Sequence, residues 1–207
     1  MPSNLVIYVD FDSTLYHTAL FSDQLRKRLS KKTGLPAEEI KADGRAFFFH
    51  PYLGGYEYEK HMAKYGLDPA EMWSLLEETC KTNFLFADSI DFIKAMRADG
   101  FDPKILSFGE KRFQSIKIQA MLPLLSSGGR DIEVVIVDKK KNQHIAALHN
   151  GQHGVLIDDV PDQDLPAGFT EIHLNRSQAL QTPLIKDNVI TISDLAQARK
   201  IINNISF

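Results

Sequence analysis

Short runs of apolar residues recur along the chain, separated by longer stretches in which apolar positions follow a helical period. The runs lie at residues 5–9, 104–106, 134–137, 155–157, 171–174 and 189–192. Unbroken apolar runs, in contrast to strict alternation, are typical of strands buried on both faces of a parallel sheet. We therefore predict that these segments form a parallel β-sheet.

The segments between the runs have the apolar spacing of amphipathic helices. Helical spacing occurs at residues 88–99, 110–122 and 193–204. We expect Asp88 or Ser89 to cap the first helix, Pro123 to end the second and Ser193 to cap the third. The alternation of strands and helices predicts an α/β fold with helices on both faces of the sheet.

One long interval breaks this alternation. About ninety residues separate Asp12 from the run that starts at Lys104, whereas a strand–helix–strand unit needs only about thirty. Helical patterns fill this interval, at residues 17–33 and 68–82. We predict that residues 15–87 form a helical module inserted after the first strand, and that residues 1–14 and 88–207 form the core.

Composition narrows the class of protein. The chain has 207 residues, a formal net charge of −3 and no extended basic stretch, so we expect no nucleic-acid partner. The one cysteine, Cys80, excludes a disulfide within the chain and is typical of a reducing compartment. No apolar run reaches the roughly 18 residues that cross a bilayer, and we see no signal peptide. We expect a soluble, cytoplasmic protein without a membrane partner.

Polar residues follow the apolar runs at the points where the strands are expected to end. In open α/β sheets, ligands bind beyond the carboxyl ends of the strands. Because those ends meet at one edge of a parallel sheet, we expect the following polar residues to converge there. They are Asp10, Asp12 and Thr14, then Ser107, then Asp138 with Lys139, Lys140 and Lys141, and finally Asp158 and Asp159.

The chemistry of such a group points to a metal and an anion. Carboxylates packed within about 4–6 Å raise one another's pKa or require a cation. A site of carboxylate oxygens suits Mg²⁺, and a lysine with a hydroxyl group suits a phosphoryl group beside the metal. A carboxylate at the centre can act as the nucleophile.

These residues occur in four short motifs whose order resembles that of the haloacid dehalogenase (HAD) superfamily, in its phosphatase-type branch. The motifs are "VDFDSTL" (9–15), "ILSFG" (105–109), "DKKKNQHI" (138–145) and "VLIDD" (155–159). The resemblance implies a Rossmannoid α/β core with a parallel sheet. It also implies that the insert at 15–87 is a helical cap of the C1 type, which matches the family by position alone.

The resemblance assigns roles to the four acids. Asp10 would be the nucleophile, with its second oxygen on Mg²⁺. Asp12 would be the general acid for the leaving group and then the base for water, with its backbone carbonyl on the metal. Asp159 would be the principal metal ligand of the last motif, with Asp158 beside it.

The resemblance also implies how the phosphate is held. Thr14 would orient the first motif and, with Ser107, bind phosphoryl oxygens. A lysine would neutralise the nucleophile and the phosphate. We favour Lys141 because Ile145 follows it by one helical turn, and Lys139 and Lys140 remain alternatives.

An aromatic segment at residues 44–61 lies within the expected cap. Its sequence, "GRAFFFHPYLGGYEYEKH", combines aromatic residues with a Gly–Gly pair. One interpretation is a hydrophobic cluster inside the cap. The other is a loop that closes over the substrate, with Arg45, His50 or Tyr52 reaching it to set specificity.

We expect an enzyme that hydrolyses a phosphate monoester of a small metabolite with Mg²⁺, through an aspartyl-phosphate. A phosphomutase using the same chemistry is an alternative, and so is a catalytically silent binding or regulatory protein on this fold. A cap that shields the site disfavours phosphoproteins as substrates. The sequence leaves open the identity of the substrate, the pathway and the oligomeric state.

Overall fold

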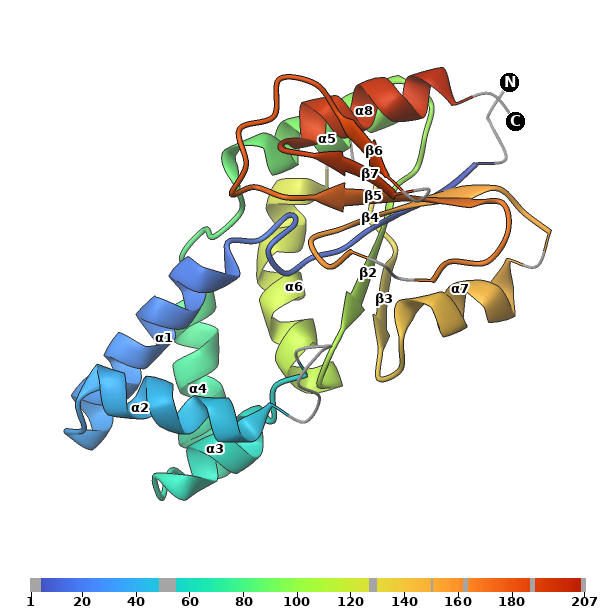
Figure 1. The fold of residues 1–207 in the computed structure, drawn as a ribbon. Helices are drawn as coiled ribbons and strands as arrows, with labels where there is room; N and C mark the ends of the chain where they lie inside the picture. The colour runs from blue at the N-terminus through green and yellow to red at the C-terminus, as the bar shows by residue number, and fades with distance from the viewer. Residues whose placement is uncertain are drawn as a thin grey trace.

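A computed structural model describes residues 5–48, 55–126, 130–149, 151–161, 164–186 and 189–205 (Figure 1). Within these residues, seven strands form one sheet in the order β3-β2-β1-β4-β5-β7-β6. All neighbouring strands are parallel except β6 and β7. The strands are β1 (Val6–Val9), β2 (Lys104–Phe108), β3 (Val134–Val137), β4 (Gly154–Asp158), β5 (Phe169–Leu174), β6 (Leu184–Lys186) and β7 (Val189–Ile192).

The predicted parallel sheet is confirmed, because each of the six apolar runs forms a strand. The exception is β6, which the hydrophobic pattern did not reveal. It is three residues long, exposed throughout and paired only along one edge, with β7. Its sequence, Leu-Ile-Lys, is too short to show a period, and a strand at the margin of a sheet needs no buried face.

Helices cover both faces of the sheet, as predicted. Alternate residues of β1 point in opposite directions: Ile7 and Val9 pack with α5, α6 and α8, whereas Tyr8 packs with Ile145 of α7. Figure 1 shows α5 and α8 on one side of the strands and α7 on the other. The helices are α5 (Ala87–Ala98), α6 (Lys111–Leu125), α7 (Lys141–Leu148) and α8 (Leu195–Asn204).

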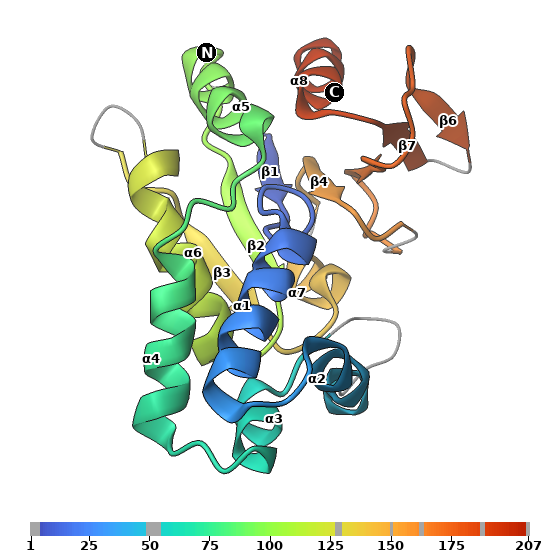
Figure 2. The ribbon, with the colours of Figure 1, turned by 90° about the vertical axis from the view of Figure 1, so that its left-hand side faces the viewer.

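The interval between β1 and α5 is helical. It contains α1 (Thr18–Thr33), α2 (Ala37–Gly44), the 3₁₀-helix η1 (Arg45–Phe47), α3 (Tyr58–Lys64) and α4 (Pro69–Cys80). Figures 1 and 2 show α1 to α4 grouped at the end of the molecule opposite α5 and α8. Apolar residues of α1 and α4 belong to the same continuous core as the strands, so this group is packed onto the sheet and does not hang free.

Helix ends in this segment follow the sequence signals. The side chain of Asp68 accepts a hydrogen bond from the Glu71 amide at 2.9 Å, and the Glu71 side chain bonds back to form a capping box at α4. Helix α1 ends at Gly34, whose φ of 77° is the left-handed conformation that glycine adopts without strain.

Three other predicted helix boundaries are wrong. The first turn of α5 has no side-chain cap, because Ser89 donates instead to the Leu15 carbonyl and Asp88 binds Arg176. Helix α6 continues past Pro123 to Leu125; in the last turn, the proline removes a single backbone bond. Helix α8 is capped by Asp194, not Ser193.

None of the helices within the described ranges is both long and apolar enough to span a bilayer.

Candidate active site

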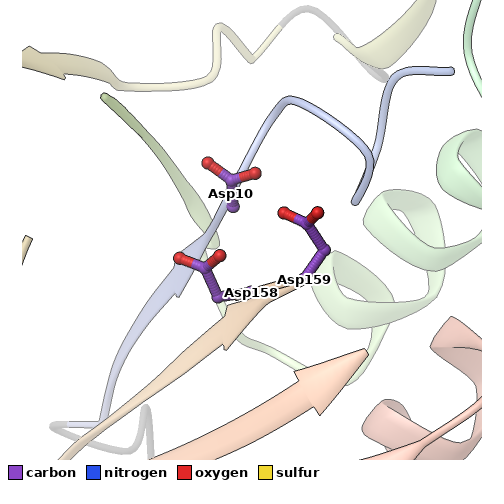
Figure 3. A group of neighbouring side chains, drawn as sticks. All are labelled: Asp10, Asp158 and Asp159. Carbon is purple, nitrogen blue, oxygen red and sulfur yellow. The ribbon is translucent and has the colours of Figure 1, made fainter. Parts of the chain in front are cut away.

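Three acids meet where β1 and β4 end. These two strands are neighbours at the centre of the sheet, with Val9 paired to Ile157. Asp10 follows β1, Asp158 is the last residue of β4, and Asp159 comes next. One carboxylate oxygen from each acid lies within 4.8 Å of the others (Figure 3). We call Asp10, Asp158 and Asp159 the acid cluster.

Lys141 is the cation of the acid cluster. It begins α7, and its Nζ donates to Oδ1 of Asp10 and, at 2.6 Å, to Oδ2 of Asp158. Burial opposes the charged form of Lys141, but the two carboxylates hold its pKa above the ordinary value. Lys139 and Lys140 are exposed, so of the three candidate lysines the structure brings only Lys141 to the acids.

One ammonium group does not balance three acids. Burial raises the pKa of Asp10 well above its usual value; Lys141 opposes this, while Asp158 and Asp159 add to it. Burial and the charge of Asp158 likewise raise the pKa of Asp159 to about 6. A buried group of carboxyls with this excess of negative charge has the ligand chemistry and the electrostatic demand of a divalent cation site.

Asp12 points away from the acid cluster and toward α6. Its Oδ1 accepts hydrogen bonds from Lys117 Nζ at 2.5 Å and from Thr18 Oγ1 at 2.7 Å. Its Oδ2 accepts from Gln114 Nε2 at 2.8 Å. Burial raises the pKa of Asp12, but Lys117 and these hydrogen bonds outweigh it and hold that pKa below its usual value. Asp12 is therefore an ionised carboxylate whose orientation is fixed by three hydrogen-bond donors.

The sequence analysis missed Lys117 and Gln114. Both lie on the buried face of α6, between Phe113 and Met121. Lys117 lies one helical turn after Phe113 and one turn before Met121, and this spacing could have indicated that the lysine is buried. Its functional meaning, however, depends on the packing of α6 beside the first turn after β1, which the sequence does not show.

The two predicted hydroxyl groups are buried. Thr14 is 0% and Ser107 is 1% exposed. Among the described residues, neither side-chain oxygen has a hydrogen-bond partner. The backbone carbonyl of Thr14 accepts from Arg176 at 2.8 Å, which ties the first turn after β1 to the residues that follow β5. A buried hydroxyl without a partner is rare and requires a reason.

A cavity of 390 Å³ extends from the acid cluster to the helical segment. At one end lie the acids and Lys141; at the other the wall is largely apolar and aromatic. Residues of that wall are Phe21, Leu25, Ile40, Phe48, Tyr56 and Phe113. The wall comes from α1, α2, α6 and the residues beside η1, so the helical segment encloses the far half of the cavity.

Of the predicted specificity residues, Arg45 lines the cavity and is exposed. His50 and Tyr52 lie outside the described residues. The structure adds His61, which also lines the cavity and bonds the Tyr56 hydroxyl through Nδ1 and the Tyr65 hydroxyl through Nε2, the latter at 3.0 Å. Burial lowers the pKa of His61 to about 4, so its ring is neutral near pH 7.

No family profile and no curated protein matches this chain. Solved structures do match over nearly the whole chain. A protein from Burkholderia xenovorans, described as a haloacid dehalogenase-like hydrolase, is 17% identical, with 97% of each chain covered and a TM-score of 0.67. A HAD phosphatase from Thermococcus onnurineus is 20% identical, with 96% of this chain and 97% of that chain covered and a TM-score of 0.63.

A third match is YfnB from Bacillus subtilis, assigned to the HAD hydrolases and solved with magnesium bound. It is 14% identical, with 97% of this chain and 99% of that chain covered and a TM-score of 0.62. Dehalogenases are also among the matches. At these identities the similarity shows a shared fold. It agrees with the fold expected from the four motifs.

Proposed function

From the haloacid dehalogenase fold of this chain, we propose that it is a Mg²⁺-dependent phosphatase that acts on a phosphate monoester of a small molecule. The observation that carries the proposal is the acid cluster with Lys141 between two of its members. Asp10 is the carboxylate that follows the inner strand β1, and Lys141 is the cation beside it. This is the arrangement that a nucleophile for an anionic phosphoryl group requires.

The reaction has two halves. In the first, a carboxylate oxygen of Asp10 bonds to phosphorus, and the bond from phosphorus to the ester oxygen breaks. Asp12 passes a proton to that oxygen, and it must take up this proton when the substrate binds, because its hydrogen bonds favour the carboxylate in the empty site. In the second, water attacks the phosphorus of the aspartyl-phosphate. Asp12 accepts its proton, inorganic phosphate leaves and Asp10 is restored. Lys141 offsets the negative charge of the phosphoryl group throughout.

The acid cluster fits a magnesium ion. It offers oxygen ligands from Asp10, Asp158 and Asp159 within 4.8 Å of one another, and Lys141 offsets only part of its negative charge. The presence of magnesium in the structural neighbour YfnB supports this identity. When bound, the ion supplies positive charge that stabilises the negative phosphoryl oxygens. The backbone carbonyl of Asp12 is a further candidate ligand.

The buried hydroxyl of Ser107 has a role in this reaction. It lacks a partner among the described residues, and it lies on β2, beside the strand that carries Asp10. A phosphoryl oxygen would supply the missing hydrogen-bond acceptor. Thr14 is closer to the turn and is proposed to orient it.

Dehalogenation is the rival reaction, because dehalogenases share this fold. A departing halide takes no proton, whereas the alkoxide released from a phosphate ester does. The hydrogen-bonded Asp12 therefore favours phosphoryl transfer. A phosphomutase would use the same residues and return the phosphoryl group to its substrate, so release of inorganic phosphate separates it from the phosphatase.

The test is hydrolysis of p-nitrophenyl phosphate by wild type, Asp10→Asn and the control variant Asp91→Asn, each with Mg²⁺ and with EDTA. Asp91 is exposed on α5. We expect turnover in wild type and the control with Mg²⁺, none with EDTA, and a loss of at least about 10³-fold in Asp10→Asn. Undiminished turnover in Asp10→Asn would contradict the nucleophile assignment. No turnover in wild type would favour a silent binding protein.

A further inference from the structure

Lys117 is an ionic side chain in an apolar environment. It is 1% exposed, and its ammonium lies 5.0 to 5.8 Å from the ring centroids of Phe11, Tyr16, Phe21 and Phe113. Replacing a buried ion pair with well-packed apolar residues is often neutral or stabilising. The stability of the fold is therefore not a sufficient reason for a lysine at this position.

The side chains around Asp12 form a closed network. Lys117 Nζ donates to Asp12 at 2.5 Å and to the Gln114 side-chain oxygen at 3.2 Å. Gln114 Nε2 donates to Asp12 at 2.8 Å and to the Phe108 carbonyl at 3.1 Å. Thr18 adds a third donor to Asp12 at 2.7 Å. Both carboxylate oxygens are thus oriented by groups from α6 and the start of α1.

This network determines which way Asp12 faces. Asp12 precedes Ser13, whose φ of 59° turns the chain, and it is only two residues from Asp10. Among the described residues, the group of carboxylates that lie within 4.8 Å of one another consists of Asp10, Asp158 and Asp159, and it does not include Asp12. Asp12 lines the same cavity but is bound to α6, which also carries Phe113 of the apolar wall.

We propose that Lys117, assisted by Gln114, is a positioning residue for the second half of the reaction proposed above. It holds the side chain of Asp12 on the α6 side of the cavity, apart from the acid cluster. There, Asp12 takes a proton from water as the water oxygen bonds to phosphorus and the bond from phosphorus to Asp10 breaks. Lys117 acts through Asp12 and touches neither water nor phosphate. This inference rests on the proposed phosphatase function.

The experiment is rapid-mixing hydrolysis of p-nitrophenyl phosphate with Mg²⁺ by wild type and Lys117→Met. Nitrophenolate leaves without protonation, so the first half-reaction proceeds in the variant. We expect a burst of nitrophenolate equal to the enzyme concentration, then a steady rate about 10²-fold below wild type, the scale of general-base catalysis. In an Asp12→Asn background, Lys117→Met should cause no further loss of the steady rate, because the two changes remove the same function.

Two further variants complete the test. Lys111→Met removes an exposed lysine from the first turn of α6 and should leave both phases unchanged. Gln114→Met removes one of the hydrogen bonds that orient Asp12 and leaves the Lys117 ammonium paired with Asp12. It should show the same burst with a steady rate about tenfold below wild type, even if Lys117→Met does not fold.

The outcomes separate the two proposals. Suppose that wild type turns over but Lys117→Met and Gln114→Met slow the burst and the steady rate equally, or add their losses to that of Asp12→Asn. That result would overturn the positioning role alone. A wild type without turnover would overturn the phosphatase proposal, and the positioning role would fall with it.

Discussion

At the scale of single residues, the main feature of the site is that two aspartates of one turn, Asp10 and Asp12, have very different charged and polar neighbours. Asp10 shares Lys141 with Asp158, whereas Asp12 accepts hydrogen bonds from Lys117, Gln114 and Thr18. The pKa of Asp10 is consequently raised by burial and by its acidic neighbours, and that of Asp12 is lowered despite burial. Opposite shifts two residues apart are typical of acid–base pairs in active sites.

The raised pKa of Asp159 predicts a pH-dependent stability of the metal-free protein. Its folded pKa is about 6, against 3.8 for the free group. The folded state therefore binds more protons than the unfolded state between these values. By linkage, the free energy of unfolding falls as pH rises, and we expect Asp159 to contribute a loss of about 1 kcal/mol between about pH 5 and about pH 7.

Urea unfolding of wild type and Asp159→Asn with EDTA, at both pH values, measures this contribution. His61 acts in the opposite sense, since its lowered pKa favours the folded state at higher pH. The difference between the two proteins at each pH cancels that effect. The stability of the variant relative to wild type should increase with pH; a difference that does not depend on pH would contradict the raised pKa.

The residues that could be predicted are those that follow strands. Asp10, Asp158 and Asp159 come directly at or after buried apolar runs, so topology alone gathers them. Lys141 was predicted from its place before Ile145, and the structure brings it to Asp10. Their catalytic roles stay predictions. Lys117 could not be assigned from the sequence, because it follows no strand and its bond to Asp12 depends on how α6 packs beside the turn after β1.

At the scale of elements, the turn from β2 to α6 determines how Gln114 reaches Asp12. Gly109 in that turn has a φ of 145°, a conformation that residues with side chains rarely adopt. A Cβ at this position would lie 2.9 Å from Gln114 Nε2, closer than real contacts allow. The absence of a side chain at position 109 therefore lets Gln114 pack against the turn while bonding Asp12.

Gly109→Ala tests this packing. Backbone strain of this kind costs about 1–3 kcal/mol, and the contact with Gln114 adds to it. A matched control is Gly34→Ala, where φ is also positive but a Cβ would meet nothing within 4 Å. We expect the free energy of unfolding to fall further in Gly109→Ala than in Gly34→Ala, measured by urea unfolding. Equal losses in the two variants would contradict the role of the Gln114 contact.

Element boundaries were predictable where the cap is local. The capping box of α4 lies within four residues, and Gly34 ends α1 through its own backbone. The prediction for α5 was wrong because Asp88 and Ser89 bond to groups distant in sequence, at Arg176 and Leu15. The first turn of that helix is thus determined by tertiary contacts, which no local pattern encodes.

At the scale of the whole molecule, the cavity lies between the carboxyl edge of the sheet and the helical segment that follows β1. A phosphoryl group bound at Asp10 would contact several elements at once, since β1, β4 and α7 each supply a side chain. A ligand that joins elements in the folded state and has no site in the unfolded state stabilises the protein in proportion to its binding free energy.

Beryllofluoride, which mimics an aspartyl-phosphate, is the probe for this effect. With Mg²⁺, we expect it to stabilise wild type by about 3 kcal/mol at a hundredfold excess over Kd. That corresponds to an increase of several degrees in Tm for a chain of this size. Thermal unfolding should show no such increase with EDTA or in Asp10→Asn. An equal increase in Asp10→Asn would mean that the anion binds elsewhere.

The fold class was predictable because strands, helices and the long interval after the first strand differ in hydrophobic period. The shape of the cavity was not. Its apolar wall combines α1, α2 and α6, which are separated in sequence, and their relative placement arises from packing among residues such as Phe21, Ile40 and Phe113. We propose that this wall selects the substrate, and the four motifs do not include its residues.

The position of β1 inside the sheet, between β2 and β4, has a consequence for how the protein is made. On the ribosome, β1 emerges before its neighbours β2 and β4, which follow about 100 and about 150 residues later. The helices of the intervening segment can form while β1 still lacks a partner, because local structure forms faster than distant pairing. A nascent chain that stops short of β4 carries Asp10, the proposed nucleophile, without Asp158 or Asp159, so the acid cluster can form only after β4 has been made.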